Sequence, residues 1–371
     1  MSTDGCRSVL LLIPTLTGGG AERVVVTLLR HLDRSKFRLT LAVVDIRKAV
    51  FQDDIPEDVE FINLGCSRVR YALPSIIRLI WERKPAVVFS TLGHLNLALA
   101  IVRPLLPDGV RYIGRESSIV SETLRCYPLP RWWRWAYRRF YHRFDTVVCQ
   151  SRYMRDDLVE NFGFPATKAV VIHNPTDFER IHHLAREPFP IKLEHEEGEN
   201  LGPAVRLVAA GRLSYTKGYD ILIEALSLCN DPRLHLTLLG EGPLRNDLKR
   251  LAQEKGVAHQ IRFAGFQKNP YPFFAQADAF VLSSRFEGLP NVVLEALACG
   301  TPVIATPAPG GVKEILEGVE GCVVADSVTA EALAKGIDHW KAISRRPLAM
   351  DVVAPFSVQN IIRQYQSMFL E

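Results

Sequence analysis

The feature that most constrains the fold is a rhythm of short apolar runs, each followed by a segment of helical periodicity, which passes through the chain twice. Short apolar runs are typical of strands that helices bury on both faces. We therefore predict an α/β protein with two doubly wound parallel sheets in tandem and helices between the strands, as at 21–32 and 73–84. The expected strands lie at 8–13, 39–44, 86–90, 111–114 and 146–149 in the first half, and at 206–210, 235–239, 261–264, 279–282 and 302–305 in the second.

The rhythm is interrupted at 182–203, which carries several prolines, an acidic cluster and no periodicity. A chain of 371 residues suits two domains better than one. We expect an N-terminal domain over 1–180, a linker or insertion over 181–203 and a C-terminal domain over 204–355. Apolar residues at helical spacing then predict a closing helix over 356–371.

Composition bears on where the protein works. No stretch approaches the roughly 20 apolar residues that a membrane-spanning helix needs. The apolar run at 9–13 is too short for the core of a signal peptide and ends at Pro14. The seven cysteines form no C-x-x-C pair, which favours reduced thiols over a disulfide framework or a zinc site. We therefore expect a cytoplasmic protein that does not cross a bilayer.

The net charge of +4 is unevenly distributed. Residues 1–180 hold 26 Lys and Arg against 19 Asp and Glu, whereas the remaining residues hold 19 against 22. A basic first half indicates an anionic partner for that half, such as phosphate groups or a lipid surface.

Glycine-rich turns follow two of the expected strands, where ligands of open α/β sheets bind. The first is TGGGAER at 17–23, which opens a helix and suits either a phosphate or a plain tight turn. The second is GRLSYTKG at 211–218. Its two cations, Arg212 and Lys217, suit a pyrophosphate, although a solvated basic turn remains an alternative.

A third segment, 283–297, carries two carboxylates near a predicted helix start. Pro290 and Asn291 suit that start, so Glu287 lies in the loop ahead of the helix and Glu295 lies inside it. Loop amides and the positive helix end can hold a diphosphate, while the carboxylates accept hydrogen bonds from sugar hydroxyls. Two glutamates eight residues apart are usually surface residues, but here they accompany the basic turn.

Taken together, E-x₇-E within EGLPNVVLEALACGTPVIAT, the preceding GRL…KG and the early GGGAER resemble the retaining glycosyltransferases of family 4 over nearly the whole chain. The resemblance implies the GT-B fold, with two Rossmann-like domains facing across a cleft and helix 356–371 crossing back to the first. It implies a nucleotide-diphosphate sugar as substrate, with UDP favoured by family frequency. The implied residues of the sugar-donor site are Arg212 and Lys217 on the pyrophosphate, Glu287 on the sugar, Glu295 on the ribose, backbone groups of Gly288, Leu289 and Asn291, the turns at Gly240, Glu241 and Phe266 around the base, and Gly19 and Gly20 in the first turn.

The chain has no Asp-x-Asp motif, so we predict a metal-independent enzyme without a cofactor. Fixed cations and helix N–H groups then stabilise the charge that develops on the departing phosphate. The family's usual proposal for retention is attack on the same face of the sugar. On the acceptor side, His94 and Glu116 each follow a strand and are candidates to orient a hydroxyl, or are ordinary loop hydrogen-bonders. Many family members have a histidine where Glu116 aligns, so the base stays open.

Residues 131–143, RWWRWAYRRFYHR, contain five arginines and no acidic residue. Helical spacing places Arg131, Arg134, Arg138 and His142 on one face, free to meet an anion, and an apolar face opposite them. Trp132 and Trp135 flank the basic row as interface anchors. Further basic candidates for the acceptor or membrane are Arg115, Arg78, Arg83 and Lys84.

We expect this helix to bind lipid phosphates or the pyrophosphate of a polyprenyl-linked acceptor. Family members that extend lipid-linked oligosaccharides are similar here. The full expectation is a monomeric peripheral protein on the inner face of the cell membrane that transfers a hexose or N-acetylhexosamine to a lipid-linked glycan. The alternatives are a solvated helix, a soluble transferase with a small-molecule acceptor, or a non-catalytic nucleotide-sugar binder. Nucleic-acid binding is disfavoured by the mildly basic total charge and the complete sugar-donor motif set.

Overall fold

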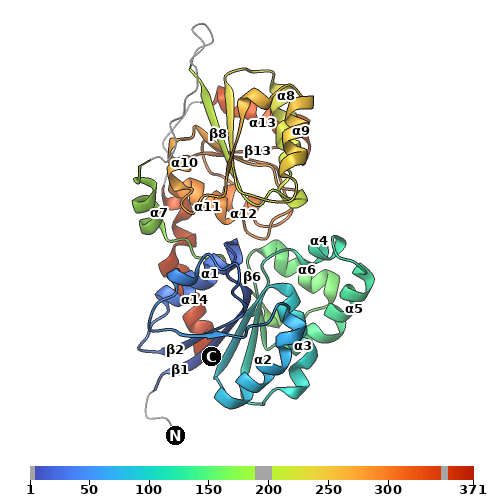
Figure 1. Cartoon of the computed structure of the whole chain (residues 1–371), viewed down its shortest axis with the longest axis vertical. Coiled ribbons are helices and arrows are strands. Elements are labelled where there is room, and N and C mark those ends of the chain that lie inside the picture. The colour runs from blue at the N-terminus through green and yellow to red at the C-terminus, as the bar shows by residue number, and fades with distance from the viewer. Residues whose placement is uncertain (1–4, 189–202, 344–349) are drawn as a thin grey trace. The chain divides into compact units, whose positions relative to one another are not determined.

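The computed structural model describes residues 5–188, 203–343 and 350–371 and divides the chain into two compact units (Figure 1). The first unit comprises Met1–Pro175 with Val358–Glu371, and the second comprises Thr176–Ser357. Each unit is built on one sheet whose neighbouring strands are all parallel. The predicted α/β class with two doubly wound sheets is confirmed.

The first sheet has seven strands among the described residues, in the order β3-β2-β1-β4-β5-β6-β7. All five strands expected in this half are present within two residues of their predicted bounds. The sequence missed β3 and β7, because each is only a few residues long at an edge of the sheet. The bounds are β1 Arg7–Thr15, β2 Phe37–Asp45, β3 Glu60–Asn63, β4 Val87–Thr91, β5 Arg111–Arg115, β6 Thr146–Cys149 and β7 Ala169–Val171.

The second sheet has the order β10-β9-β8-β11-β12-β13 within the part of the chain that is described. Its five predicted strands are present, and the two-residue edge strand β13 was missed. Alternate residues of β8 enter different apolar cores, with Leu207 on one face and Val208 on the other. The bounds are β8 Val205–Ala210, β9 Leu234–Leu239, β10 Ile261–Gly265, β11 Ala279–Leu282, β12 Val303–Ala305 and β13 Val323–Val324.

Helices cover both faces of the second sheet, α8, α9 and α13 on one and α7, α10 and α11 on the other. Among the described residues, no helix is long and apolar enough to cross a membrane. The helices of the first unit are α1 Gly20–His31, α2 Val69–Arg83, α3 Gly93–Val102, α4 Val120–Arg125, α5 Pro130–Phe140, α6 Arg152–Phe162 and α14 Val358–Leu370. Those of the second are α7 Phe178–Ala185, α8 Tyr219–Cys229, α9 Arg245–Glu254, α10 Tyr271–Gln276, α11 Asn291–Ala298, α12 Val312–Leu316 and α13 Ala330–Ala342.

The last helix, α14, returns to the first unit as predicted (Figure 1). Tyr365 and Phe369 are fully buried there and contact the ring of Phe89 edge-on, with centroids 5.8 and 5.5 Å away. Arg7 of β1 donates to the Phe369 carbonyl at 2.7 Å, so the C-terminal carbonyls of α14 are satisfied by the sheet that it covers.

The boundary between the units falls at Pro175 and Thr176, five residues before the expected one. Helix α7 occupies the start of the expected linker. Its Ile181 is buried in the core of the second unit, and Asp177 accepts a hydrogen bond from the Arg180 N–H as the N-cap. An apolar face therefore holds this segment to the second unit. Residues 189–202 of the expected linker lie outside the described residues.

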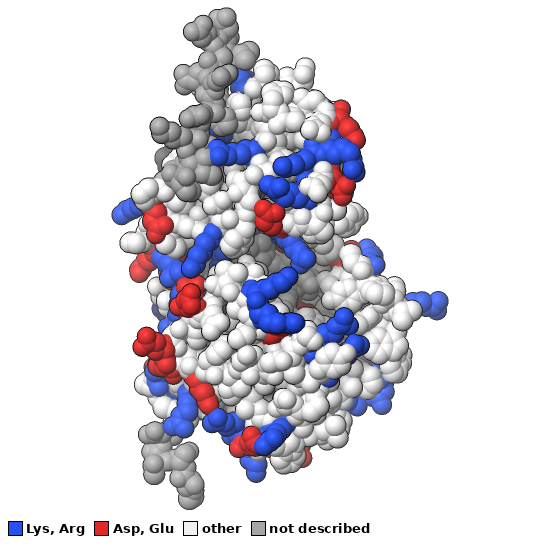
Figure 2. All heavy atoms as spheres, in the orientation of Figure 1, with Lys and Arg blue, Asp and Glu red and all other residues white. Residues whose placement is uncertain are grey.

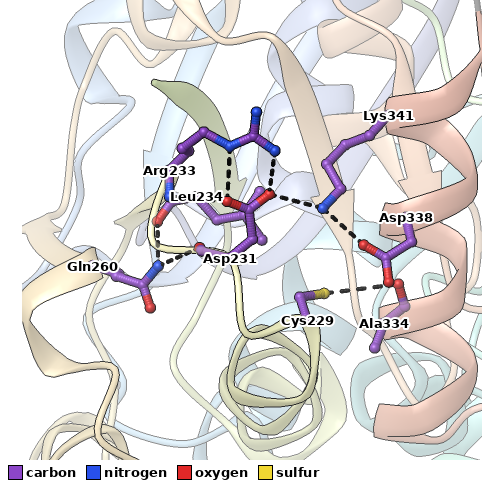
Figure 3. Close-up of polar contacts among 8 residues, drawn as sticks. All are labelled: Cys229, Asp231, Arg233, Leu234, Gln260, Ala334, Asp338 and Lys341. Atoms are coloured by element: carbon purple, nitrogen blue, oxygen red, sulfur yellow. Dashed lines mark hydrogen bonds and ion pairs between the residues drawn. The ribbon is translucent and has the colours of Figure 1, made fainter. Parts of the chain in front are cut away.

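A cluster of polar contacts ties the turn before β9 to α13 (Figure 3). The carboxylate of Asp231 is only 10% exposed and pairs with Arg233 at 2.9 Å and Lys341 at 3.0 Å. Lys341 also pairs with Asp338, at 2.8 Å. Hydrogen bonds from Arg233 and Lys341 hold the pKa of the Asp231 carboxyl well below its ordinary value. The cluster lies away from the carboxyl ends of the strands and is structural.

We predict that Asp231→Asn lowers the free energy of unfolding by about 1–3 kcal/mol at pH 7, since a nearly buried charge partner is lost. Because the pKa of Asp231 is lower in the folded state than in the unfolded state, its charge stabilises the fold at pH values above the unfolded pKa. The difference in unfolding free energy between wild type and Asp231→Asn should therefore shrink progressively below pH about 4. Urea unfolding at pH 7, 5 and 3.5 measures it. Asp247→Asn is the control, because its ion pair with Arg250 is exposed. Equal losses in both variants would contradict the assignment.

Candidate functional site

In the second unit, three turns are tied together at the carboxyl edge of the sheet. The Leu213 N–H donates to the Glu241 carbonyl at 3.0 Å, and the Gly240 N–H donates to the Gly265 carbonyl at 2.7 Å. The turns after β8, β9 and β10 therefore form one continuous wall. Phe266 lies at its end with half of its surface exposed. This wall contains Gly240, Glu241 and Phe266, the residues expected around the base.

Lys217 and Glu287, which are seventy positions apart in the sequence, form an ion pair. Lys217 Nζ lies 2.6 Å from Glu287 Oε1, and the two side chains are 23% and 11% exposed. Ser284 Oγ donates to the same carboxylate oxygen at 2.5 Å. The structure therefore brings together a cation and a carboxylate that the sequence assigned to one site. Ser284 was not predicted as a site residue.

A second ion pair braces the turn that carries Lys217. Arg285 donates to both carboxylate oxygens of Asp220, at 2.8 and 2.5 Å, and to the Tyr215 carbonyl at 2.8 Å. Its guanidinium also lies over the Tyr215 ring, 4.1 Å from the centroid. Arg285 was not predicted as a site residue, because spacing alone did not indicate that it contacts the 211–218 turn.

Two glycines permit the close approach of these loops. Gly218 has φ of 59°, and a Cβ there would collide with the Ser283 carbonyl. Gly310 has φ of 118°, and a Cβ there would collide with the carbonyl of Glu287. Only glycine satisfies both the conformation and the contact. Sequence analysis did not indicate Gly310 as a site residue, because its contact at Glu287 lies more than twenty positions away.

The remaining predicted residues of this site lie along the same edge. Arg212 is exposed, next to Gly211. Glu295 is buried inside α11, with 4% exposure. Helix α11 begins at Asn291 with Pro290 as N-cap, as predicted, and Gly288 and Leu289 precede it. The N–H groups of its first turn follow directly after the loop that holds Glu287.

In the first unit, Glu116 lies at the carboxyl end of β5 and is buried. The Tyr141 hydroxyl donates to its carboxylate, and Asn96 Nδ2 approaches the same oxygen at 3.5 Å. Burial raises the pKa of Glu116 to about 7, although these hydrogen bonds oppose the shift. Burial also raises the pKa of Tyr141 well above its ordinary value, so the phenol remains a hydrogen-bond donor.

Glu116 lines a small cavity of about 80 Å³ together with His94. The His94 ring is reachable from solvent but has protein on most sides, and this desolvation lowers its pKa. Leu92, also in the wall, has φ of 76°, a conformation that costs a non-glycine residue about 1–3 kcal/mol. Such strain is concentrated at functional sites. The structure therefore brings the two predicted acceptor-side residues to one cavity.

The first glycine turn differs from the expectation of an open phosphate site. Glu22 of α1 is buried, and its carboxylate lies against Gly19, where a Cβ would collide with it. Thr15 Oγ1 donates to the same carboxylate at 3.1 Å. The turn at Gly19 and Gly20 therefore already holds a carboxylate of the chain, which opposes a phosphate there.

The arginine row of α5 is also not free as expected. Arg138 donates to the Asn161 carbonyl at 3.0 and 3.2 Å, and Arg134 lies 3.5 Å from the same oxygen. Both arginines thus cap the C-terminal end of α6, whose last carbonyls lack helical partners. Arg131 and His142 are exposed, and so are Trp132 and Trp135, at 48% and 53%. Figure 2 shows mostly basic charged side chains on the side of this unit where Figure 1 labels α5.

Arg115 does not lie at the surface, contrary to its expected place near an acceptor or membrane. Its side chain is completely buried, and it donates to Thr91 Oγ1 at 3.3 Å and to Asn174 Oδ1 at 2.6 Å. Its role is internal, because these bonds join the end of β5 to the end of β4 and to the segment after β7. Within residues 5–188, 203–343 and 350–371, no three His, Cys, Asp or Glu side chains are grouped as metal ligands.

The two halves of the chain are similar to two families of known proteins. The family model "Glycosyltransferase Family 4" matches residues 18–180, and "Glycosyl transferases group 1" matches residues 191–351. An uncharacterized glycosyltransferase of Methanocaldococcus jannaschii is 31% identical over 251 residues, which are 65% of this chain and 60% of that relative's length. The Campylobacter jejuni enzyme N-acetylgalactosamine-N,N'-diacetylbacillosaminyl-diphospho-undecaprenol 4-alpha-N-acetylgalactosaminyltransferase is 25% identical over 325 residues, 82% of each chain.

Solved structures share the fold over nearly the whole chain. Anabaena HepE, in a complex with UDP and glucose, superposes with a TM-score of 0.75 at 19% identity, over 98% of this chain and 99% of that one. A glycosyltransferase from Rickettsia africae superposes with the same TM-score at 18% identity, over 98% of each chain. At these identities the likeness shows the fold alone.

We predict that Glu116→Gln gains stability relative to wild type as pH rises. A free glutamate loses its proton near 4.5, whereas Glu116 keeps it to about 7. Between these values the native state binds more protons than the unfolded state, so wild-type stability falls with rising pH. The difference in unfolding free energy between Glu116→Gln and wild type, measured by urea unfolding, should change by about 2–3 kcal/mol between pH 5 and pH 8.

The control for this experiment is Glu82→Gln on α2, whose side chain is 56% exposed. The difference in unfolding free energy between Glu82→Gln and wild type should barely change with pH. A Glu116→Gln difference that is equally flat would show that the carboxyl of Glu116 ionises normally in the folded protein.

Proposed function

The chain belongs to the GT-B glycosyltransferases, with a family 4 domain followed by a group 1 domain, and we propose that it transfers a hexose or N-acetylhexosamine from a UDP-sugar to a polyprenyl-pyrophosphate-linked glycan. The proposal includes retention of configuration, independence from metal ions and a peripheral position on the cytosolic face of the membrane. The name of the Campylobacter jejuni relative supports a lipid-linked acceptor, and the UDP complex of the Anabaena structure supports the choice of UDP.

The observation that carries the proposal is the contact of Lys217 and Ser284 with Glu287. A nucleoside diphosphate leaves with charge developing on its phosphate oxygens, and a fixed cation next to a helix N-terminus stabilises that charge. Lys217 and Arg212 supply the cations, and the start of α11 supplies N–H groups. Glu287 is held beside them by two side-chain donors, 2.6 and 2.5 Å away, and this position supports a role in accepting hydrogen bonds from sugar hydroxyls.

On the acceptor side, we propose that the cavity beside Glu116 and His94 orients the attacking hydroxyl. A carboxyl with a pKa of about 7 is partly ionised at neutral pH and can accept a proton there. His94 is neutral at that pH, because its pKa is lowered, and it serves as a hydrogen-bond partner. The sequence lacks an Asp-x-Asp motif, which supports the proposal that cationic side chains, and not a metal ion, stabilise the negative charge on the leaving phosphate.

We predict that the protein transfers the sugar of one nucleotide sugar and that EDTA does not lower the transfer rate. The rate should fall at least a hundredfold in Glu287→Ala. Purified protein is mixed with a panel of nucleotide sugars, with and without EDTA, and a polyprenyl-pyrophosphate-linked sugar as acceptor. Product analysis of the anomeric linkage tests retention. Glu254→Ala, at an exposed position on α9, is the control and should keep wild-type rates.

Each part of the proposal has its own contrary result. Loss of transfer in EDTA would refute metal independence. An inverted product would refute retention. A chain that neither transfers nor binds any nucleotide sugar would refute the activity itself.

A further inference from the structure

The first unit contains a second and larger hollow, a groove of about 550 Å³. This volume lies within the range of small-molecule sites. The groove lies between the ends of β1 and β2, the start of α2, the side of α3 and the start of α5. Its walls are mostly apolar, and the apolar residues that line it include Leu73, Leu97, Ala98, Ile101, Trp132 and Trp133.

The groove also has a basic side. Arg68 and Arg70, at the start of α2, line it and are exposed. Asp45 is its acidic residue, but Arg47 neutralises that carboxylate at 2.6 Å. An apolar channel with two arginines at its edge is complementary to an amphiphile that carries an anionic phosphate next to a hydrocarbon chain.

The groove adjoins the small cavity of Glu116, because His94 and Trp133 line both. Large apolar side chains are exposed on the helices around it, including Tyr71 at 55%, Leu105 at 61% and Trp132 at 48%. Exposed apolar patches of this kind mark surfaces that meet a membrane or a ligand. The groove is therefore flanked by exposed apolar side chains and also adjoins the candidate acceptor cavity.

We propose that this groove holds the first isoprene units of the acceptor lipid, with the adjacent phosphate bound by Arg68 and Arg70. The inference rests on the proposed function and deepens it by assigning the lipid end of the acceptor to named residues. It moves the phosphate away from the arginine row of α5, because Arg134 and Arg138 are already used in capping α6. Trp132 of α5 then contributes a wall of the lipid groove.

The first test is photolabelling of the full-length protein, in detergent, with a farnesyl diphosphate that carries a benzophenone. We expect label on the peptides of α3 and α5. Ala98→Trp fills the groove and Arg68→Glu repels the phosphate, so each should reduce labelling at least fivefold. Ala166→Trp makes the same substitution at an exposed residue outside the groove, and Arg139→Glu reverses an exposed charge outside it. Both controls should label as wild type does.

The second test compares two acceptors with the same sugar, one on a polyprenyl pyrophosphate and one on a short water-soluble aglycone. Ala98→Trp should raise KM about tenfold for the lipid-linked acceptor alone. Equal loss with both acceptors, label outside the groove, or label that Ala98→Trp leaves unchanged would overturn the proposal. So would competition by a diacyl phospholipid as effective as that by unlabelled farnesyl diphosphate, since the groove would then be a bilayer-lipid site.

The two proposals fail in different ways. Label confined to the groove without transfer to either acceptor supports the groove and refutes the proposed transfer reaction. Equal transfer to both acceptors, with no label in the groove, refutes the groove and leaves the glycosyltransferase activity standing.

Discussion

The second unit depends on backbone contacts that only glycine permits. The turn at Gly218 lies against the Ser283 carbonyl, and Gly310 lies against the carbonyl of Glu287. Three loops from distant parts of the sequence thereby pack without side chains between them. Because the backbones meet this closely, Lys217 reaches Glu287 at 2.6 Å. Both side chains remain partly exposed. The ion pair is therefore a consequence of glycine packing, and the Arg285–Asp220 pair then holds the same loops in register.

The first unit holds its strand ends together by a different means, a buried chain of hydrogen bonds between side chains. Asn96 donates to the Arg115 carbonyl at 2.9 Å, Gln150 to the Glu116 carbonyl at 2.8 Å, and Asn174 to Gln150 at 2.9 Å. Arg115 completes the chain through Asn174. Amide side chains donate hydrogen bonds to the buried backbone carbonyls but carry no charge to neutralise a carboxylate. Burial therefore raises the pKa of Glu116 to about 7. The carboxyl of Glu116 is therefore partly protonated near neutrality.

The sequence predicted what is local and what lies at strand ends. Apolar runs predict ten strands, and the carboxyl-edge rule predicts Lys217 and Glu287 at one edge of the second sheet, where the structure has them 2.6 Å apart. It could not identify partners far along the chain, such as Ser284 for the Glu287 carboxylate or Asn174 for Arg115. Helical spacing put Arg134 and Arg138 on one face correctly, but it cannot reveal that another helix ends against that face. Edge strands such as β13 were missed, because two residues give no period to detect.

The use of Arg134 and Arg138 in capping α6 has a consequence for acceptor recognition. A guanidinium that already donates to a carbonyl has fewer N–H groups for a phosphate, and moving it would expose the end of α6. In the acceptor site that we propose, an anionic lipid is therefore bound by arginines that no helix end requires. Arg68 and Arg70 meet that condition, since both are exposed at the rim of an apolar groove. Helix α5 thus lines the groove through its tryptophans, while Arg134 and Arg138 fix it to α6.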